Sequence, residues 1–142
     1  MTNKEKLAYL AGFVDGEGCI TLGRCKKGKW DSYHCDFIIA NTDERVMRWI
    51  VREFGGTYYT KKPGAPQWKP VHRWYAKRDI IVSLLTQLRP LLLIKRRQAT
   101  IALKFLASRK RGWGSRGITS EEWRYRDKLI RRNHELNKVG PK

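Results

Sequence analysis

Two carboxylates end a stretch that otherwise has the composition of a helix. Asp15 and Glu17 follow the run Leu10-Ala11-Gly12-Phe13-Val14 and alternate with glycines at positions 16 and 18. The C-terminal end of a helix carries partial negative charge and favours Lys, Arg or His over acids. Two acids at such an end therefore need a nearby cation. Carboxylate oxygens are ligands that divalent metals prefer, so this segment is a candidate metal site.

The same segment has small residues at a helical spacing. Ala8, Gly12 and Gly16 lie at i, i+4 and i+8, which places them on one face of the helix. Such a face allows either a second helix or the chain's own sheet to pack very closely. The acids at the same end favour the first alternative, because a symmetric pair of these helices would bring two copies of Glu17 together. Two adjacent carboxylates stay ionised only beside cations, so the pattern predicts a homodimer with a metal site at its axis.

The charge of the chain predicts a polyanionic partner. The 142 residues include 31 Lys and Arg against 13 Asp and Glu, which gives a net charge of +18 and a pI of about 10.3. Nucleic acid is the first expectation for so basic a domain, and an anionic membrane surface is the second. No apolar run approaches the roughly 18 residues that a spanning helix needs, so no membrane partner is predicted.

The three cysteines predict free thiols. Cys19, Cys25 and Cys35 contain no Cys-x-x-Cys pair, and their spacing matches no zinc-ligand pattern. An odd number of unpaired thiols is typical of an intracellular, reducing compartment, either an organelle or a prokaryotic cytoplasm. The first six residues do not have the pattern of a signal peptide.

Local signals predict an α+β domain with one antiparallel sheet. Helices are expected at residues 3–16, 43–54, 79–88, 90–108 and 119–137, and strands at 19–25, 33–41, 57–62 and 71–77. Asn3 is the expected N-cap of the first helix, and Pro90 lies in the first turn of the fourth. Residues 1–108 form the expected core domain, and a basic loop and terminal helix at 109–142 pack on it.

Two blocks of this sequence resemble the LAGLIDADG homing endonucleases. The first is Leu10–Gly18, which has Gly16 in place of Ala and Glu17 in place of the second Asp of the family signature. The second is Leu88–Ala99, which resembles the Pro-x-Leu-x-x-Lys-x-x-Gln-Ala segment of the family. The resemblance covers roughly residues 4–106 and implies an αββαββα fold with a four-stranded DNA-binding sheet and additional C-terminal helices.

The resemblance also implies residue roles. Glu17 would be a metal ligand, and Gly16 would contribute its backbone carbonyl. Lys95 would lie beside the scissile phosphates, and Asp43 would help to position water. Mg²⁺ is the implied metal, with Mn²⁺ and Ca²⁺ as substitutes. A chain with one signature copy implies a homodimer whose interface includes Ala8, Ala11, Gly12, Asp15 and Gly16.

Polar strand positions are expected to form a DNA-binding face. A two-stranded β-ribbon fits the major groove, and alternate side chains then face the bases; the alternative is a solvated polar face. The expected base-facing residues are Thr21, Arg24, His34, Asp36, Tyr58, Thr60, Lys62, Arg73, Tyr75 and Lys77. Phosphate contacts are expected from the turns and the C-terminal loop, at Lys26, Lys27, Lys29, Lys61, Lys69, Arg109, Lys110, Arg111 and Arg116.

The function implied by these features is site-specific endonucleolytic hydrolysis of double-stranded DNA. The homodimer would cut a long, near-palindromic target and leave short 3′ overhangs. One alternative is a non-cleaving nucleic-acid-binding protein on the same fold, such as an RNA maturase, for which RNA would be a partner, or a DNA-binding regulator. Another is a general cationic protein with no sequence preference.

Overall fold

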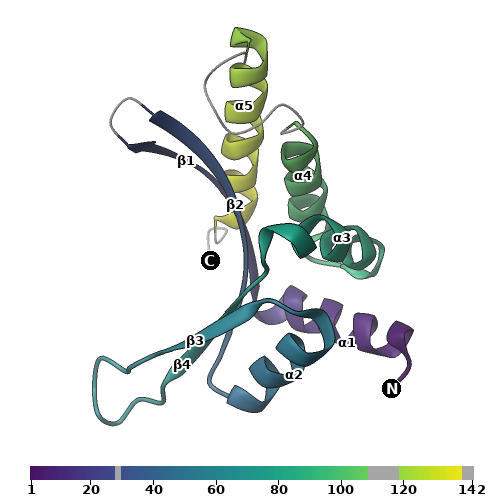
Figure 1. The fold of residues 1–142 in the computed structure, drawn as a ribbon, viewed down its shortest axis with the longest axis vertical. Coiled ribbons are helices and arrows are strands. Elements are labelled where there is room, and N and C mark those ends of the chain that lie inside the picture. The colour runs from purple at the N-terminus through teal and green to yellow at the C-terminus, as the bar shows by residue number, and fades with distance from the viewer. Residues whose placement is uncertain (28–29, 109–118, 139–142) are drawn as a thin grey trace.

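The computed structural model has a curved sheet with every helix on one side (Figure 1). It describes residues 1–27, 30–108 and 119–138, with backbone only at 26, 27, 30 and 31. No helix within these described ranges is long and apolar enough to cross a membrane. The elements are α1 (Asn3–Glu17), β1 (Gly18–Lys27), β2 (Trp30–Asn41), α2 (Glu44–Phe54), β3 (Thr57–Lys61), β4 (Val71–Tyr75), α3 (Arg78–Leu88), η1 (Arg89–Leu91), α4 (Arg96–Ala107) and α5 (Ser120–Asn137).

The sheet is antiparallel, with the strand order β1-β2-β4-β3. Opposed residues in an antiparallel sheet share a face, so the register divides each strand into a covered and an open set. The covered set includes the fully buried apolar residues Ile20, Phe37, Ile39 and Trp74. None of the described helices lies on the opposite face of the sheet (Figure 1). The expected α+β class and αββαββα order are confirmed.

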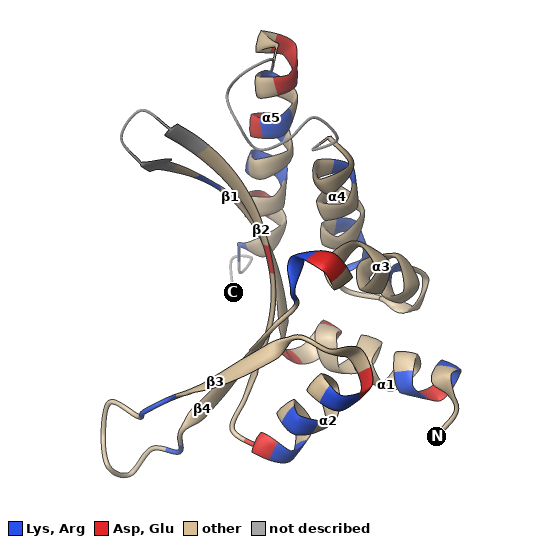
Figure 2. Cartoon of the chain, viewed as in Figure 1, with Lys and Arg blue, Asp and Glu red and all other residues tan. Residues whose placement is uncertain are grey.

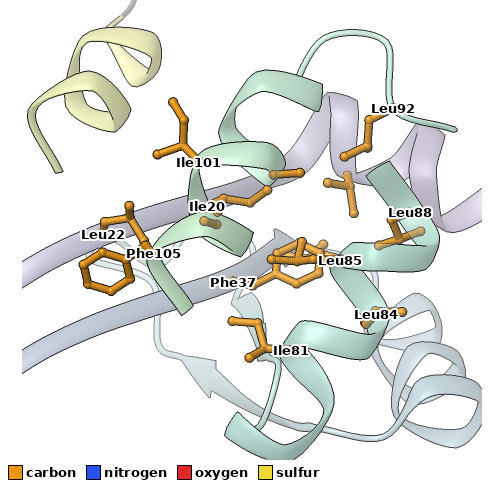
Figure 3. Packing of buried hydrophobic residues seen from close by; sticks show 14 of the residues in the cluster. Ile20, Leu22, Phe37, Ile81, Leu84, Leu85, Leu88, Leu92, Ile101 and Phe105 are labelled. Atoms are coloured by element: carbon orange, nitrogen blue, oxygen red, sulfur yellow. The ribbon is translucent and has the colours of Figure 1, made fainter. Parts of the chain in front are cut away.

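The hydrophobic core lies between the covered face of the sheet and helices α3 and α4. Phe37 and Trp74 meet edge to face at the sheet, with ring centroids 5.4 Å apart. Leu85 and Leu88 of α3 and Phe105 of α4 are fully buried in the same cluster (Figure 3). This packing fixes the helices relative to the sheet, and it therefore fixes the ends of α1 and α4 where the candidate chemistry lies.

Two helix starts differ from the sequence prediction. Thr2, not Asn3, caps α1, and it forms a capping box with Glu5. The helix expected from residue 90 begins only at Arg96, after the short 3-10 helix η1. Leu93, Ile94 and Lys95 are not helical because their backbone N–H groups donate to the carboxylate of Asp15. A contact with a residue about 80 positions away cannot be read from local periodicity.

Helix α5 covers the outer edge of β1 through polar side chains. The amide of Asn133, which is fully buried, accepts from the N–H of Leu22 at 3.1 Å and donates to the carbonyl of Ile20 at 3.1 Å. Asn137 donates to the same carbonyl at 2.8 Å. An edge strand exposes unpaired backbone groups, and these side chains satisfy them. The apolar positions Leu129 and Ile130 are buried beside them.

Candidate active site

Asp15 joins the end of α1 to the start of α4. Its carboxylate accepts hydrogen bonds from the backbone N–H groups of Leu93 at 2.8 Å, Ile94 at 3.2 Å and Lys95 at 3.0 Å. Partial burial alone would raise the pKa of Asp15, but these three hydrogen bonds outweigh it and hold the pKa below its ordinary value. Asp15 is therefore an ionised cap for α4, placed where a helix N-terminus favours negative charge.

Lys95 makes the reciprocal contact. Its ammonium group donates to the carbonyl of Asp15 at 2.7 Å and to the carbonyl of Val14 at 3.1 Å. These carbonyls belong to the last turn of α1, which favours a cation, and the carbonyl of Val14 also accepts from the N–H of Gly18. The cation that the acidic end of α1 requires is thus supplied by a residue 80 positions further along the chain. Each of the two residues caps the helix that carries the other.

Glu17 lies at the same end but has a different environment. It is the last residue of α1, it is exposed, and it has no hydrogen bond or ion pair with any residue in the described part of the chain. Gly18 follows and is buried, and a Cβ at this position would lie 2.7 Å from the carbonyl of Val14. Only glycine therefore lets the chain turn from α1 directly into β1, which leaves Glu17 exposed at the bend.

One chain alone offers few donors for a metal ion at the end of α1. No group of three or more His, Cys, Asp or Glu side chains able to hold a metal occurs among the residues described. The exposed Glu17 carboxylate and the carbonyl of the adjacent, exposed Gly16 are oxygen donors of the kind that Mg²⁺ and Ca²⁺ prefer. These donors fit a divalent cation, with further ligands from a second chain, a substrate phosphate or water.

The small-residue face of α1 is open. Ala8, Gly12 and Gly16 are exposed, and a Cβ built on either glycine meets nothing within 4 Å. Ala11 corrects the prediction, because it is 1% exposed in the core of its own chain and is not available to a partner. It falls on the same side of α1 as the buried residues Leu10 and Val14.

Asp43 is the N-cap of α2. Its carboxylate accepts from the backbone N–H of Arg45 at 2.9 Å and from the guanidinium of Arg45 at 2.6 Å. These hydrogen bonds lower the pKa of Asp43 to about 2, so the carboxylate is ionised throughout the neutral range. The expected role of Asp43 in positioning water stays a prediction, since the structure shows it in a capping role.

The open face of the sheet holds five of the ten predicted base-facing residues. Thr21 and Asp36 are opposed across β1 and β2, and His34 is opposed to Gly23. The His34 ring covers Gly23, where a Cβ would come within 2.3 Å of the ring. Arg73 and Tyr75 lie on the same face in β4, opposed to Ala40 and Ile38.

Strand β3 corrects the prediction by one residue. Tyr58 and Thr60 are opposed to Trp74 and His72, which lie on the helix-covered face. Tyr58 donates to Glu44 of α2 at 2.8 Å, and the hydroxyl of Thr60 lies 2.8 Å from Nδ1 of His72. A shift of one residue moves every side chain of a strand to the other face. In Thr57-Tyr58-Tyr59-Thr60 both alternating sets are polar-aromatic, so sequence alternation could not distinguish them.

Tyr59 is the open-face residue that the sequence reasoning missed. It stacks on Tyr75 with ring centroids 5.4 Å apart, and the two hydroxyls are 2.8 Å from each other. This hydrogen bond and partial burial raise the pKa of Tyr75, while the positive charge of the nearby Arg73 acts in the opposite direction. Lys61 lies on the same face as Tyr59, by alternation along β3.

Arg24 is a second correction. It is opposed to Tyr33 and so belongs to the covered set, in the same phase as Leu22. Its guanidinium lies 5.0 Å from the ring centre of Trp123 and pairs with Asp127 of α5 at 3.4 Å. Arg24 therefore attaches the first hairpin to α5.

The predicted phosphate contacts are only partly placed. Lys69 is exposed in the second hairpin, and Lys62 and Lys77, two of the expected base-facing residues, are exposed and lie outside strands β3 and β4. Lys26 and Lys27 lie in β1, but their side chains are not described. The remaining predicted contacts, Lys29, Arg109, Lys110, Arg111 and Arg116, lie outside the described residues.

Comparisons with known proteins agree with this architecture. The family model described as LAGLIDADG endonuclease matches residues 10–97. The DNA endonuclease I-CreI of Chlamydomonas reinhardtii is 32% identical over 114 residues, which cover 73% of this chain and 64% of that protein. The matched region thus spans less than two thirds of the length of that relative.

Two solved structures share the fold. The homing endonuclease I-CvuI in complex with its target, in the presence of Ca, superposes with a TM-score of 0.77 at 18% identity, covering 98% of this chain and 87% of that one. The archaeal intron-encoded homing endonuclease I-Vdi141I complexed with DNA gives 0.80 at 15% identity, covering 99% and 89%. The match to the family model extends from the acidic end of α1 to the start of α4 that carries Lys95, and the chain belongs to the LAGLIDADG endonuclease family.

Proposed function

We propose that this chain is a site-specific endonuclease that hydrolyses double-stranded DNA as a homodimer. The observation that carries the proposal is the exposed Glu17 beside the open glycine face of α1. One chain supplies a single exposed acid at the end of α1. The face of α1 that a second copy would approach is not covered by other side chains of the same chain. The target would be a long, near-palindromic duplex, since a two-fold dimer recognises two related half-sites.

Exposed apolar side chains beside α1 support the dimer. Leu93 is 84% exposed and Ile94 is 70% exposed, although both donate backbone N–H groups to Asp15. Two adjacent, large and exposed apolar side chains at the end of the small-residue face are typical of a surface that is covered on association. The close approach of two α1 helices would then place both Glu17 residues near the axis.

A divalent cation held by Glu17 and the Gly16 carbonyl would polarise the phosphate and lower the pKa of the attacking water. The solved complexes of the relative I-CvuI with DNA were obtained in the presence of Ca or Mg. Lys95 would stabilise the negative charge that develops on the phosphate. Its ammonium group is held near Glu17 because it donates to the carbonyl of Asp15, which lies two residues before Glu17 in the sequence. Asp15 would position Lys95 through its backbone, without contacting the substrate.

The open face of the sheet would bind the major groove. Arg73 is suited to guanine, since arginine binds the O6 and N7 atoms of that base with two hydrogen bonds. Its Nε atom is buried and has no hydrogen-bond partner among the described residues, and Tyr59 and Tyr75 flank it on the same face. The planar guanidinium of arginine loses little entropy for each hydrogen bond that it forms.

Selection from a randomised duplex library tests this proposal. The protein is incubated with the library and Mg²⁺, and the cut ends are sequenced, with chelator and Ca²⁺ reactions as controls. We expect one near-palindromic sequence to be enriched among the cut ends, with short 3′ overhangs, and no cutting in chelator. Enrichment of bound but uncut DNA in Mg²⁺ would instead favour a non-cleaving regulator or an RNA maturase. No enrichment of any sequence would contradict both and favour a general cationic protein.

A further inference from the structure

Part of the positive charge of the chain lies away from the open face of the sheet. From Lys95 onward the sequence has 15 Lys and Arg against 4 Asp and Glu, so +11 of the +18 lies in this third of the chain. In the described part most of these cations lie on α4 and α5, which pack on the helix-covered side of the sheet (Figure 2). DNA on the open face would leave the exposed cations of these two helices without an anionic partner.

A groove of about 230 Å³ collects four of these cations between α4 and α5. Arg96, Arg97 and Lys104 come from α4 and Arg132 from α5, over a floor that includes Ile101 and Leu129. None of the described residues that line the groove is acidic. The side chains of Arg97, Lys104 and Arg132 are exposed and form no ion pair or hydrogen bond within the described ranges.

Arg96 is held in place at the mouth of this groove. Its guanidinium donates to the carbonyl of Leu92 at 2.9 Å and to that of Pro90 at 3.0 Å. Neutral carbonyls hold the guanidinium without neutralising its charge. Four like charges around one groove repel each other unless an anion lies among them, and phosphates arranged along a nucleic-acid backbone release counterions on such a surface.

The groove lies between two helices on the covered side of the sheet, opposite to the proposed DNA face (Figure 1). On α4, Arg97 and Lys104 lie on the side of the helix opposite to Ala102, which is fully buried in the core. The core and the sheet therefore separate the groove from the open face (Figure 1). A duplex lying along the open face does not fill it.

We propose that the α4–α5 groove binds the phosphodiester backbone of a single-stranded nucleic acid, independently of duplex DNA on the sheet. The groove is smaller than the ~300–1,000 Å³ of pockets for drug-sized ligands, which suits one ribose-phosphate unit better than a duplex. Arginine binds phosphate through paired N–H groups. No aromatic side chain lines the groove in the described part, so binding would depend on charge and tolerate any base sequence.

A pair of charge-matched variants tests this proposal. The groove variant carries Arg97→Ala, Lys104→Ala and Arg132→Ala, and the control carries Arg89→Ala, Arg124→Ala and Arg131→Ala, three exposed cations outside the groove. Fluorescence anisotropy measures the binding of labelled oligo(U) RNA, oligo(dT) DNA and a random duplex over a range of salt concentrations. Circular dichroism and thermal melting of both variants show whether they fold, and a charge-conserving variant, Arg97→Lys with Arg132→Lys, should lose less affinity than the groove variant.

Three outcomes decide between the alternatives. We expect the groove variant to bind both single strands about tenfold more weakly than the control variant, with the slope of log K against log salt reduced by about 2. Its affinity for the random duplex should match that of the control. Equal loss of single-strand binding in the two variants would contradict the proposal and indicate diffuse charge. A loss of affinity confined to the random duplex would also contradict the proposal. It would indicate that the groove binds duplex DNA that flanks the part bound by the sheet.

Discussion

The junction of α1 with α4 and the open face of the sheet are built by different means. At the junction, Asp15 and Lys95 form five hydrogen bonds between segments about 80 residues apart, and each of the five joins a charged side chain to a backbone group. On the open face, side chains are placed by strand register alone, and neighbours such as Tyr59 and Tyr75 contact mainly each other. The hydrogen bonds at the junction hold Asp15 and Lys95 in place, whereas the residues of the open face can be substituted one at a time. We infer that the first serves cleavage chemistry and the second serves recognition.

Closing the α1 face should have the largest effect. Gly12→Leu adds a side chain where the monomer has open space, so the fold should be unaffected, and helix propensity should rise. Two α1 helices could no longer approach closely, and we expect loss of both dimerisation and cleavage. Sedimentation velocity and a cleavage assay measure these, with the exposed α3 substitution Thr86→Leu as a control. A Gly12→Leu protein that still dimerises and cleaves would place the interface elsewhere.

Removal of the junction cation should come next. Lys95→Met keeps the length of the side chain but loses the charge that binds the carbonyls of Val14 and Asp15. We expect cleavage to slow by roughly 10²–10³-fold, the range found for loss of one charge-stabilising donor. DNA affinity should change no more than in Arg89→Met, an exposed cation of η1. Equal cleavage rates in these two variants would show that Lys95 only caps α1.

Loss of the reciprocal cap should lower stability. Asp15→Ala leaves three backbone N–H groups without their acceptor, and we expect the free energy of unfolding to fall by about 1–2 kcal/mol. Because the folded protein lowers the pKa of Asp15, this stabilisation is complete above the ordinary value of 3.8 and disappears as the pH falls below it. Urea unfolding at several pH values measures the effect. A stability difference from wild type that persists unchanged at low pH would exclude an ionised cap.

The smallest expected effects come from substituting two adjacent tyrosines that lie on opposite faces of the sheet. Tyr59→Phe removes a hydroxyl from the open face, and Tyr58→Phe removes one that donates to Glu44 on the covered face. We expect the first to change base preference a few-fold without changing stability, and the second to lower the melting temperature slightly without changing preference. Sequencing of bound library DNA and thermal melting measure the two. The reverse pattern would contradict the observed register of β3.

The sequence predicts the order of the elements well because most of them follow from local periodicity. The buried alternation of Ile20, Leu22, Phe37 and Ile39 needs no knowledge of the rest of the chain. The acids that end α1 also stand out, since they oppose the helix dipole. The sequence does not show that Lys95 is the cation that compensates the negative charge at the end of α1. The coil before α4 cannot be predicted from the sequence either, because it depends on the same contact between Asp15 and the backbone of residues 93–95.

Strand register is the second feature that could not be predicted from the sequence. Arg24 reads as a base-facing residue near a hairpin tip, but it continues the covered phase and pairs with Asp127, a residue more than 100 positions away. Tyr58 and Tyr59 are nearly equivalent as a sequence, and only the pairing with β4 assigns them to opposite faces. The fully buried Asn133 was also missed, because a polar residue on a helix reads as exposed until the edge of β1 is known to need it.

Substitution of Glu17 tests the central claim most directly. Glu17→Gln keeps the size of a side chain that has no partner in the described part of the chain, so folding and dimerisation should be unaffected. Binding to the selected duplex is measured in Ca²⁺, and cleavage of the same duplex is measured in Mg²⁺. We expect DNA affinity to stay near that of wild type while cleavage is abolished, and Glu17→Asp to keep part of the activity because it retains an anionic oxygen ligand. Cleavage by Glu17→Gln at the wild-type rate would contradict the account, as would loss of DNA binding in a folded dimer.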